Sequence, residues 1–98
     1  MFLAWTWDNE KNRTNKCDHG LSFESAQYVF RDLLAVSRPD PYPHEERWQT
    51  IGMIGNMTIF VVHTWPDPDP DTGEETGRII SAREATPYER RAYEEGTL

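Results

Sequence analysis

The chain has 98 residues and a net charge of −7, from 10 basic and 17 acidic side chains. We expect this length to form one domain, residues 1–98, around a single core. The net negative charge excludes nucleic-acid binding by the surface as a whole, because such binding needs positive charge. Five acids fall between residues 67 and 75, so the charge is uneven and leaves room for a basic patch elsewhere.

Several classes of protein are excluded by residue counts. Cys17 is the one cysteine, so an intrachain disulfide cannot form. His19, His44 and His63 are too scattered to predict a zinc site, and we expect no metal and no cofactor. No apolar run reaches the roughly 18 residues that span a membrane, and the first residues lack the basic segment of a signal peptide. We therefore expect a cytoplasmic protein without membrane contact.

The first two elements should be a strand over residues 2–7 and a polar helix over residues 9–17. Asp8 precedes the helix and is a good N-cap. Gly20 suits the left-handed conformation that ends a helix. Because the helix is polar nearly all round, we expect it to bury little surface.

A second helix is predicted over residues 22–34. Ser22 can cap it, and an apolar stripe then follows helical spacing. The stripe should pack on a sheet. A short strand over residues 34–37 comes next, followed by a proline-spaced loop that cannot be a central strand.

The remaining chain reads as strands and one last helix. Strands are predicted over residues 47–53 and 57–64, joined by Gly55-Asn56 as a two-residue hairpin turn. The second of these strands is apolar on both faces, which favours a central place in the sheet. An acidic loop over residues 66–76 leads to a strand over residues 78–83. Thr86, Pro87 and Glu89 form the pattern of a capping box that starts a helix ending near residue 95.

This order of elements predicts an α+β fold. We expect an antiparallel sheet of about four to five strands, with two N-terminal helices and one C-terminal helix. The core should contain the apolar residues that face inward from the second helix and the sheet, namely Phe23, Phe30, Leu33, Ile59, Val61 and Ile79.

Short motifs in a fixed order run through nearly the whole chain: Trp7-Asp8 with Lys11 and Asn15, His19-Gly20, Ser22-Phe23-Glu24 with Ala26, Val29-Phe30, Glu45-Glu46-Arg47, Ile51-Gly52, Val61-Val62-His63-Thr64, Arg78 to Arg83, Ala85-Thr86, Glu89-Arg90 and Tyr93-Glu94. In this order and spacing the chain resembles the BrnT family of type II toxins. The resemblance implies a RelE-like fold and a ribonuclease that arrests translation. It also implies a BrnA-like antitoxin whose ribbon-helix-helix part dimerises and binds the operator.

The resemblance sets the expected partners. We expect two toxins bound to an antitoxin dimer, a heterotetramer, with RNA as the substrate. Contact with DNA should be indirect, through the antitoxin, because the chain is acidic.

Two positions depart from the family pattern. Asp18 stands where the family usually has a Lys before His-Gly, and Trp65-Pro66-Asp67 stands where an Arg usually follows His-Thr. Both departures remove positive charge where an RNA phosphate could bind.

Four residues are candidates for RNA cleavage. His63 has the ordinary pKa that suits proton transfer near neutrality, and Glu46 could act as a base. Arg78 and Arg83 could stabilise charge on the phosphate. Because five residues separate the two arginines, a regular strand would place them on opposite faces. For each candidate, the alternative is an ordinary structural or solvent-facing role.

Four further residues are candidates for RNA binding. They are Arg47 as a phosphate anchor, Lys11 and Lys16 on the first helix, and Tyr93 on the last helix. The lysines could instead simply face solvent, and Tyr93 could pack its helix on the sheet. Two functions remain open from the sequence. One is an active endoribonuclease, and the other is a degenerate toxin that acts as a corepressor of its antitoxin.

Overall fold

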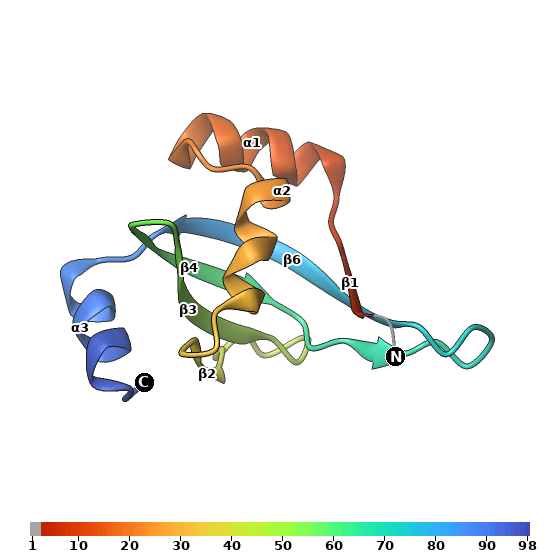
Figure 1. The fold of residues 1–98 in the computed structure, drawn as a ribbon. Coiled ribbons are helices and arrows are strands. Elements are labelled where there is room, and N and C mark those ends of the chain that lie inside the picture. Colours follow the sequence, from red (N-terminus) through yellow and green to blue (C-terminus); the bar gives the residue numbers. More distant parts are fainter. Residues whose placement is uncertain (1–2) are drawn as a thin grey trace.

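The computed structural model describes residues 3–98 (Figure 1). The elements are, in chain order, β1 (Leu3–Thr6), α1 (Asn9–His19), α2 (Phe23–Ala26), the 3₁₀ helix η1 (Gln27–Arg31), β2 (Val36–Pro39), β3 (Trp48–Ile54), β4 (Met57–His63), β5 (Asp67–Pro68), β6 (Glu75–Glu84) and α3 (Pro87–Glu95). Figure 1 shows α1 and α2 on one side of the sheet and α3 on the other. Phe2, which the predicted first strand included, lies outside the described residues.

The α+β class is confirmed. The sheet has the order β1-β6-β4-β3-β2, and β5 pairs with β6. As predicted, β4 is central, and the Gly55-Asn56 turn joins it to β3 with Ile54 opposite Met57. The edge pair differs from the antiparallel pattern, because β1 runs parallel to β6. Helices follow β1 in the chain and cross the sheet. For this reason β1 and the next strand in sequence do not form a hairpin.

The polar first helix forms as predicted and covers a strand edge. The carboxylate of Asp8 accepts the backbone N–H of Lys11 at 3.0 Å, and Gly20 ends the helix with φ of 69°. Asn15 is its one buried residue. The Asn15 amide donates to the Ala82 carbonyl at 2.7 Å and accepts the Ala82 N–H at 3.1 Å. In this way α1 supplies hydrogen-bond partners for the backbone of β6 beyond the point where β1 ends.

The second helix is shorter than predicted. Four residues of α2 pass into the five-residue 3₁₀ helix η1, and Asp32 is extended. The Asp32 carboxylate accepts the N–H of Leu34 at 2.9 Å and that of Met53 at 2.8 Å. These bonds turn the chain away from the helix, and Leu33 is 98% exposed. The prediction that Leu33 lies in the core is therefore wrong.

The main core lies between the sheet and α2. Phe23, Ile59, Val61 and Ile79 are buried there, as predicted. Phe30 is half-buried and stacks on Trp5, with ring centroids 3.8 Å apart. A smaller cluster on the opposite face, made by Ile51, Phe60 and Ala85, packs against Tyr93 and Leu98.

The last helix begins as the sequence predicts. The Thr86 hydroxyl accepts the Glu89 N–H at 3.2 Å, and the Glu89 carboxylate accepts the Thr86 N–H at 2.9 Å. This capping box fixes the first turn of α3 and with it the position of the Glu89 side chain.

An irregularity in β6 decides which side chains share a face. His63 pairs with Ile79 but Val62 pairs with Ser81, so Ile80 is an extra residue in β6. As a result, Ile79 and Ala82 both face the main core, although they are three positions apart, an odd number. The residues next to them, Arg78 and Arg83, therefore share the opposite face of the sheet.

Candidate functional site

Three arginines come from two strands to the sheet face opposite α2. Arg78 and Arg83 belong to β6, and Arg38 belongs to the edge strand β2. Arg38 lies two residues after Val36, which packs in the smaller cluster on this face. We call this surface the arginine face, and α3 covers one end of it.

Arg83 is held firmly beside α3. Its two terminal nitrogens donate to the two carboxylate oxygens of Glu89, at 2.7 and 3.0 Å. Its guanidinium carbon lies 4.2 Å from the centre of the Phe60 ring. The hydrogen bond to Glu89 raises the pKa of Arg83. Burial alone would raise the pKa of Glu89, but the bonds from Arg83 and Thr86 outweigh burial and lower it. Arg83 is thus a fixed cation with a carboxylate in the place that a phosphate would take.

Arg78 occupies the other end of the arginine face. It donates to Glu45 Oε1 at 2.6 Å, and the same oxygen accepts from Arg47 Nε at 2.9 Å. The Arg47 guanidinium also lies 3.8 Å from the centre of the Tyr42 ring. Hydrogen bonds from Arg78, then from Arg47, lower the pKa of Glu45. Two arginines therefore share one carboxylate, and the group keeps one uncompensated positive charge.

Arg38 was not among the predicted site residues. Its Nε donates to the Gln49 amide oxygen at 2.6 Å, and the Gln49 amide nitrogen donates to Asp40 at 2.7 Å. Arg38 is exposed, and its partner in this chain is a neutral amide. The sequence signal was present in the alternation of Val36 and Arg38, which puts both on one face of a strand.

His63 lies in the core, not on the arginine face. It is fully buried, its Nε2 is 2.6 Å from the Thr50 hydroxyl, and its Nδ1 is 3.0 Å from the Thr64 carbonyl. Burial lowers the pKa of His63, although the bond to Thr64 opposes the shift. Trp5, Phe30 and Trp65 contact the ring at near-right angles. This position suits a structural histidine.

A pocket of about 310 Å³ opens at the end of the sheet beside Arg78. We call it the Trp pocket, after the rings of Trp48 and Trp65, whose centroids are 5.5 Å apart at an angle of 55°. The other lining residues are Glu45, Glu46, Thr64, Asp67 and Arg78. Glu46 is exposed, and the Trp48 indole N–H points to its carboxylate at 3.4 Å.

The other RNA-binding candidates lie elsewhere. Lys11 and Lys16 are exposed on α1, which covers the β6 edge and not the arginine face. Lys11 lines a hollow with Asp18 and Ile80, so Asp18 places negative charge beside it. Tyr93 donates its hydroxyl proton to Asp32 at 2.6 Å, and this bond raises the pKa of Tyr93 to about 12.

The four candidates for cleavage are therefore not gathered in one cluster. Arg78 and Glu46 line the same pocket, Arg83 is anchored to Glu89, and His63 is in the core. Five residues at about 3.3 Å each put the Arg78 and Arg83 backbones roughly 16 Å apart. The structure adds Glu45, Glu89 and Arg38 to the charged groups of this face.

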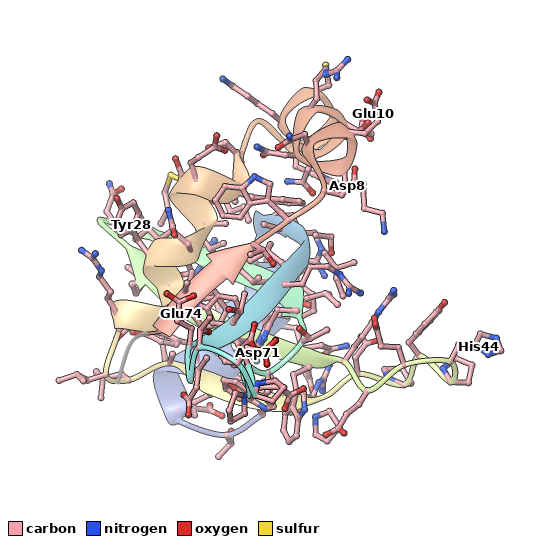
Figure 2. The ribbon with its side chains drawn as sticks, turned by 90° about the vertical axis from the view of Figure 1, so that its right-hand side faces the viewer. Asp8, Glu10, Tyr28, His44, Asp71 and Glu74 are labelled. Atoms are coloured by element: carbon pink, nitrogen blue, oxygen red, sulfur yellow. The ribbon has the colours of Figure 1, made fainter. Side chains whose placement is uncertain are left out.

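Figure 2 labels three side chains on two loops of the molecule. Asp71 and Glu74 lie on the loop between β5 and β6, and His44 lies on the projecting loop before β3. Within residues 3–98, no three His, Cys, Asp or Glu side chains are grouped so that they could hold a metal ion. None of the helices in this part of the chain is long and apolar enough to cross a membrane.

Comparison with known families gives one match. The model of the family described as the ribonuclease toxin BrnT of type II toxin-antitoxin systems matches residues 7–89. No curated protein matches the chain. Because the family match covers most of the chain, the protein belongs to the BrnT family of ribonuclease toxins, and this class implies an antitoxin partner. Each site candidate from Lys11 to Arg83 falls inside the matched range, whereas Tyr93 lies beyond it.

Proposed function

We propose that this BrnT-family chain is a metal-independent endoribonuclease that inhibits translation and uses its arginine face to bind RNA. The observation that carries the proposal is the irregularity at Ile80, which brings Arg78 and Arg83 to one face of the sheet. Arg38 extends the same face by a third positive charge. A row of fixed guanidinium groups is suited to a polyphosphate backbone.

In this proposal the arginines supply most of the rate enhancement. The 2′-oxygen of a ribose loses its proton and forms a bond to the adjacent phosphorus. The bond from phosphorus to the 5′-oxygen of the next nucleotide breaks, and that oxygen takes a proton from water. Negative charge increases on the phosphate in the transition state, and a preorganised cation there is typically the largest catalytic factor. Arg78 lies beside the candidate base Glu46 and therefore acts on the phosphate under attack, whereas Arg83, whose plane Glu89 and Phe60 fix, holds a neighbouring phosphate of the same RNA strand.

Proton transfer is the smaller part of the proposed mechanism. Glu46 is the candidate to take the 2′-hydroxyl proton, because it is exposed and lines the pocket beside Arg78. Since His63 is buried and hydrogen-bonded at both ring nitrogens, we assign it a supporting role. It orients Thr50 and Thr64, and Thr64 in turn accepts the Arg78 N–H through its hydroxyl at 2.9 Å.

The intramolecular ion pairs favour a second candidate function. Glu45 and Glu89 already occupy the groups of Arg78 and Arg83 that a phosphate would bind. An RNA phosphate must displace these carboxylates or bind beside them. If they are not displaced, the chain is a degenerate toxin that serves as a corepressor of its antitoxin.

Induced expression distinguishes the two functions. The active ribonuclease should stop growth when the chain is expressed alone, and growth should return when the neighbouring reading frame is co-expressed. Purified protein should cleave RNA in the presence of EDTA as well as in its absence. Harmless expression, together with intact RNA at high protein concentration, would establish the corepressor function instead.

The proposed partner is a BrnA-like antitoxin. We propose an assembly of two toxins with one antitoxin dimer, in which the antitoxin makes the DNA contacts because the toxin carries a net charge of −7. Light scattering on the co-purified complex should give the mass of this heterotetramer. The mass of a heterodimer, one toxin with one antitoxin chain, would contradict the proposed assembly.

A further inference from the structure

The Trp pocket combines aromatic rings with an excess of carboxylates. Glu45, Glu46 and Asp67 line it together with Arg78, and Arg47 pairs with Glu45 from outside the lining, so the group has a net charge of −1. The loop that follows adds Asp69, Asp71 and Glu74. A negative pocket beside a negative loop attracts a cation.

The chain itself shows how such a surface holds a guanidinium. Arg47 lies on the ring of Tyr42 and pairs with Glu45. Arg83 lies over the ring of Phe60 and pairs with Glu89. In each case an aromatic face and a carboxylate bind one guanidinium together.

The Trp pocket also combines aromatic rings with carboxylates, the pair of groups that binds a guanidinium in the two cases above. Trp65 is 41% exposed, and its ring stands at 55° to that of Trp48, so the two rings form an open corner. Within residues 3–98, neither Glu46 nor Asp67 forms an ion pair. Desolvation lowers the pKa of the buried His63 behind Trp65 and so favours its neutral form.

We infer that the Trp pocket receives a cationic side chain, an arginine or a lysine, from the antitoxin. Its charged end pairs with Glu46 and Asp67, and its flat face or alkyl part lies against Trp48 and Trp65. This inference rests on the proposed function for the identity of the partner. It adds a means of neutralisation, because a cation bound at Glu46 occupies the candidate base and blocks the Arg78 end of the arginine face.

A pair of short peptides tests the pocket by itself. Acetyl-Gly-Arg-Gly-amide is titrated into the full chain, and the indole N–H signals of Trp48 and Trp65 are followed by NMR. The control peptide carries citrulline, which keeps the planar shape of arginine but has no charge. We expect both indole signals to shift with the arginine peptide and the affinity to fall about five-fold or more with citrulline. Equal binding of the two peptides would overturn the inference.

Variants separate the pocket from the acidic loop. Glu46→Gln and Trp65→Ala should each weaken binding of the arginine peptide by about three-fold to ten-fold, since each removes one of the two partners of the cation. Glu74→Gln, an exposed acid outside the pocket lining, is the matched control and should bind normally. Thermal melting of each variant reports whether it is folded. Loss of binding in Glu74→Gln equal to that in Glu46→Gln would show a diffuse charge effect and contradict a defined pocket.

Two further measurements distinguish the partner from the substrate. Guanosine monophosphate should shift the indole signals less than the arginine peptide does, and the reverse order would make the pocket an RNA-base subsite. Addition of the antitoxin should shift the same signals, and a complex that leaves them unchanged would overturn the inference. If the arginine peptide binds but the neighbouring gene product does not, the pocket stands and the proposed partner fails.

Discussion

The two faces of the sheet use buried and charged side chains in opposite ways. On the face under α2, Phe23, Ile59, Val61 and Ile79 are almost wholly buried, and even His63 has both ring nitrogens bonded. On the arginine face, beyond the small cluster under α3, ion pairs at the surface take the place of packing. The first arrangement stabilises the fold, whereas the second holds cations in place at little cost to stability. Substitutions on the two faces should therefore affect different measurements.

The largest effect on stability should come from Phe23→Ala. Phe23 is fully buried, so its truncation should lower the free energy of unfolding by about 3–5 kcal/mol. The matched control is Leu33→Ala, which removes an apolar side chain that is 98% exposed and should change stability by less than about 0.5 kcal/mol. Urea unfolding measures both. Similar losses in the two variants would mean that the end of the second helix packs differently from its place in the structure.

Arg83→Ala should have the largest effect on activity and a small effect on the fold. Loss of this fixed phosphate contact should reduce RNA cleavage by about 10–100-fold, the usual worth of a hydrogen bond to a charged group, and abolish growth arrest. The control is Arg13→Ala on α1, whose ion pair with Glu10 is highly exposed and which should cleave normally. Cleavage assays and melting curves are compared for both. If the Arg83→Ala protein melts normally and still arrests growth, the proposed role of Arg83 in RNA binding is wrong.

Gly77→Ala should destabilise the face under α2 without touching the charged groups. A Cβ atom at Gly77 would overlap the Trp5 ring, which packs against the main core. Crowding of this kind typically costs about 1–3 kcal/mol. Thermal denaturation measures the loss. Gly73→Ala is not a suitable control, because Gly73 has φ of 75° and would be strained for a different reason. A neutral Gly77→Ala would show that Trp5 can move aside.

The pH dependence of stability should report the burial of His63. Because burial lowers the pKa of His63 in the folded state, the unfolded chain binds the proton more readily. Stability is therefore complete above the unfolded value of about 6.5 and is lost progressively as the pH falls through the lower folded value. His63→Leu should remove this part of the slope, which lies below about pH 6.5. Chemical unfolding at several pH values measures it, and an unchanged slope would assign the effect to other groups.

Tyr93→Phe should give the smallest effect of the set. It removes the bond from the Tyr93 hydroxyl to Asp32 but leaves the Asp32 bonds to Leu34 and Met53. The expected loss is about 0.5–1.5 kcal/mol. Since the pKa of Tyr93 is raised to about 12, this stabilisation should be present below about pH 10 and lost as the pH rises toward 12. RNA cleavage should be unchanged. A large loss of cleavage would instead support a role for Tyr93 in RNA binding.

The sequence by itself determined where the helices begin, where the first and last helices end, and the position of the hairpin. Asp8, Gly20 and the capping box of Thr86 and Glu89 act through bonds to backbone groups a few residues away. The Gly55-Asn56 turn acts over the same short range. Such features need no partner from elsewhere in the fold, so they can be predicted from neighbouring residues in the sequence. The order of short motifs gave the family for a similar reason, because it too is a property of the linear chain.

Tertiary structure alone decided which chemical groups meet. The parallel pairing of β1, the extra residue Ile80 and the bonds that Asp32 makes to Met53 all depend on strands distant in sequence. The regular alternation of a strand placed Arg78 and Arg83 on opposite faces, and the irregularity brought them to one. His63 had the right chemistry for catalysis, but its alternating position on β4 put it in the core. Periodicity predicts the faces of an ideal element, whereas a single inserted residue exchanges those faces for the remainder of the strand.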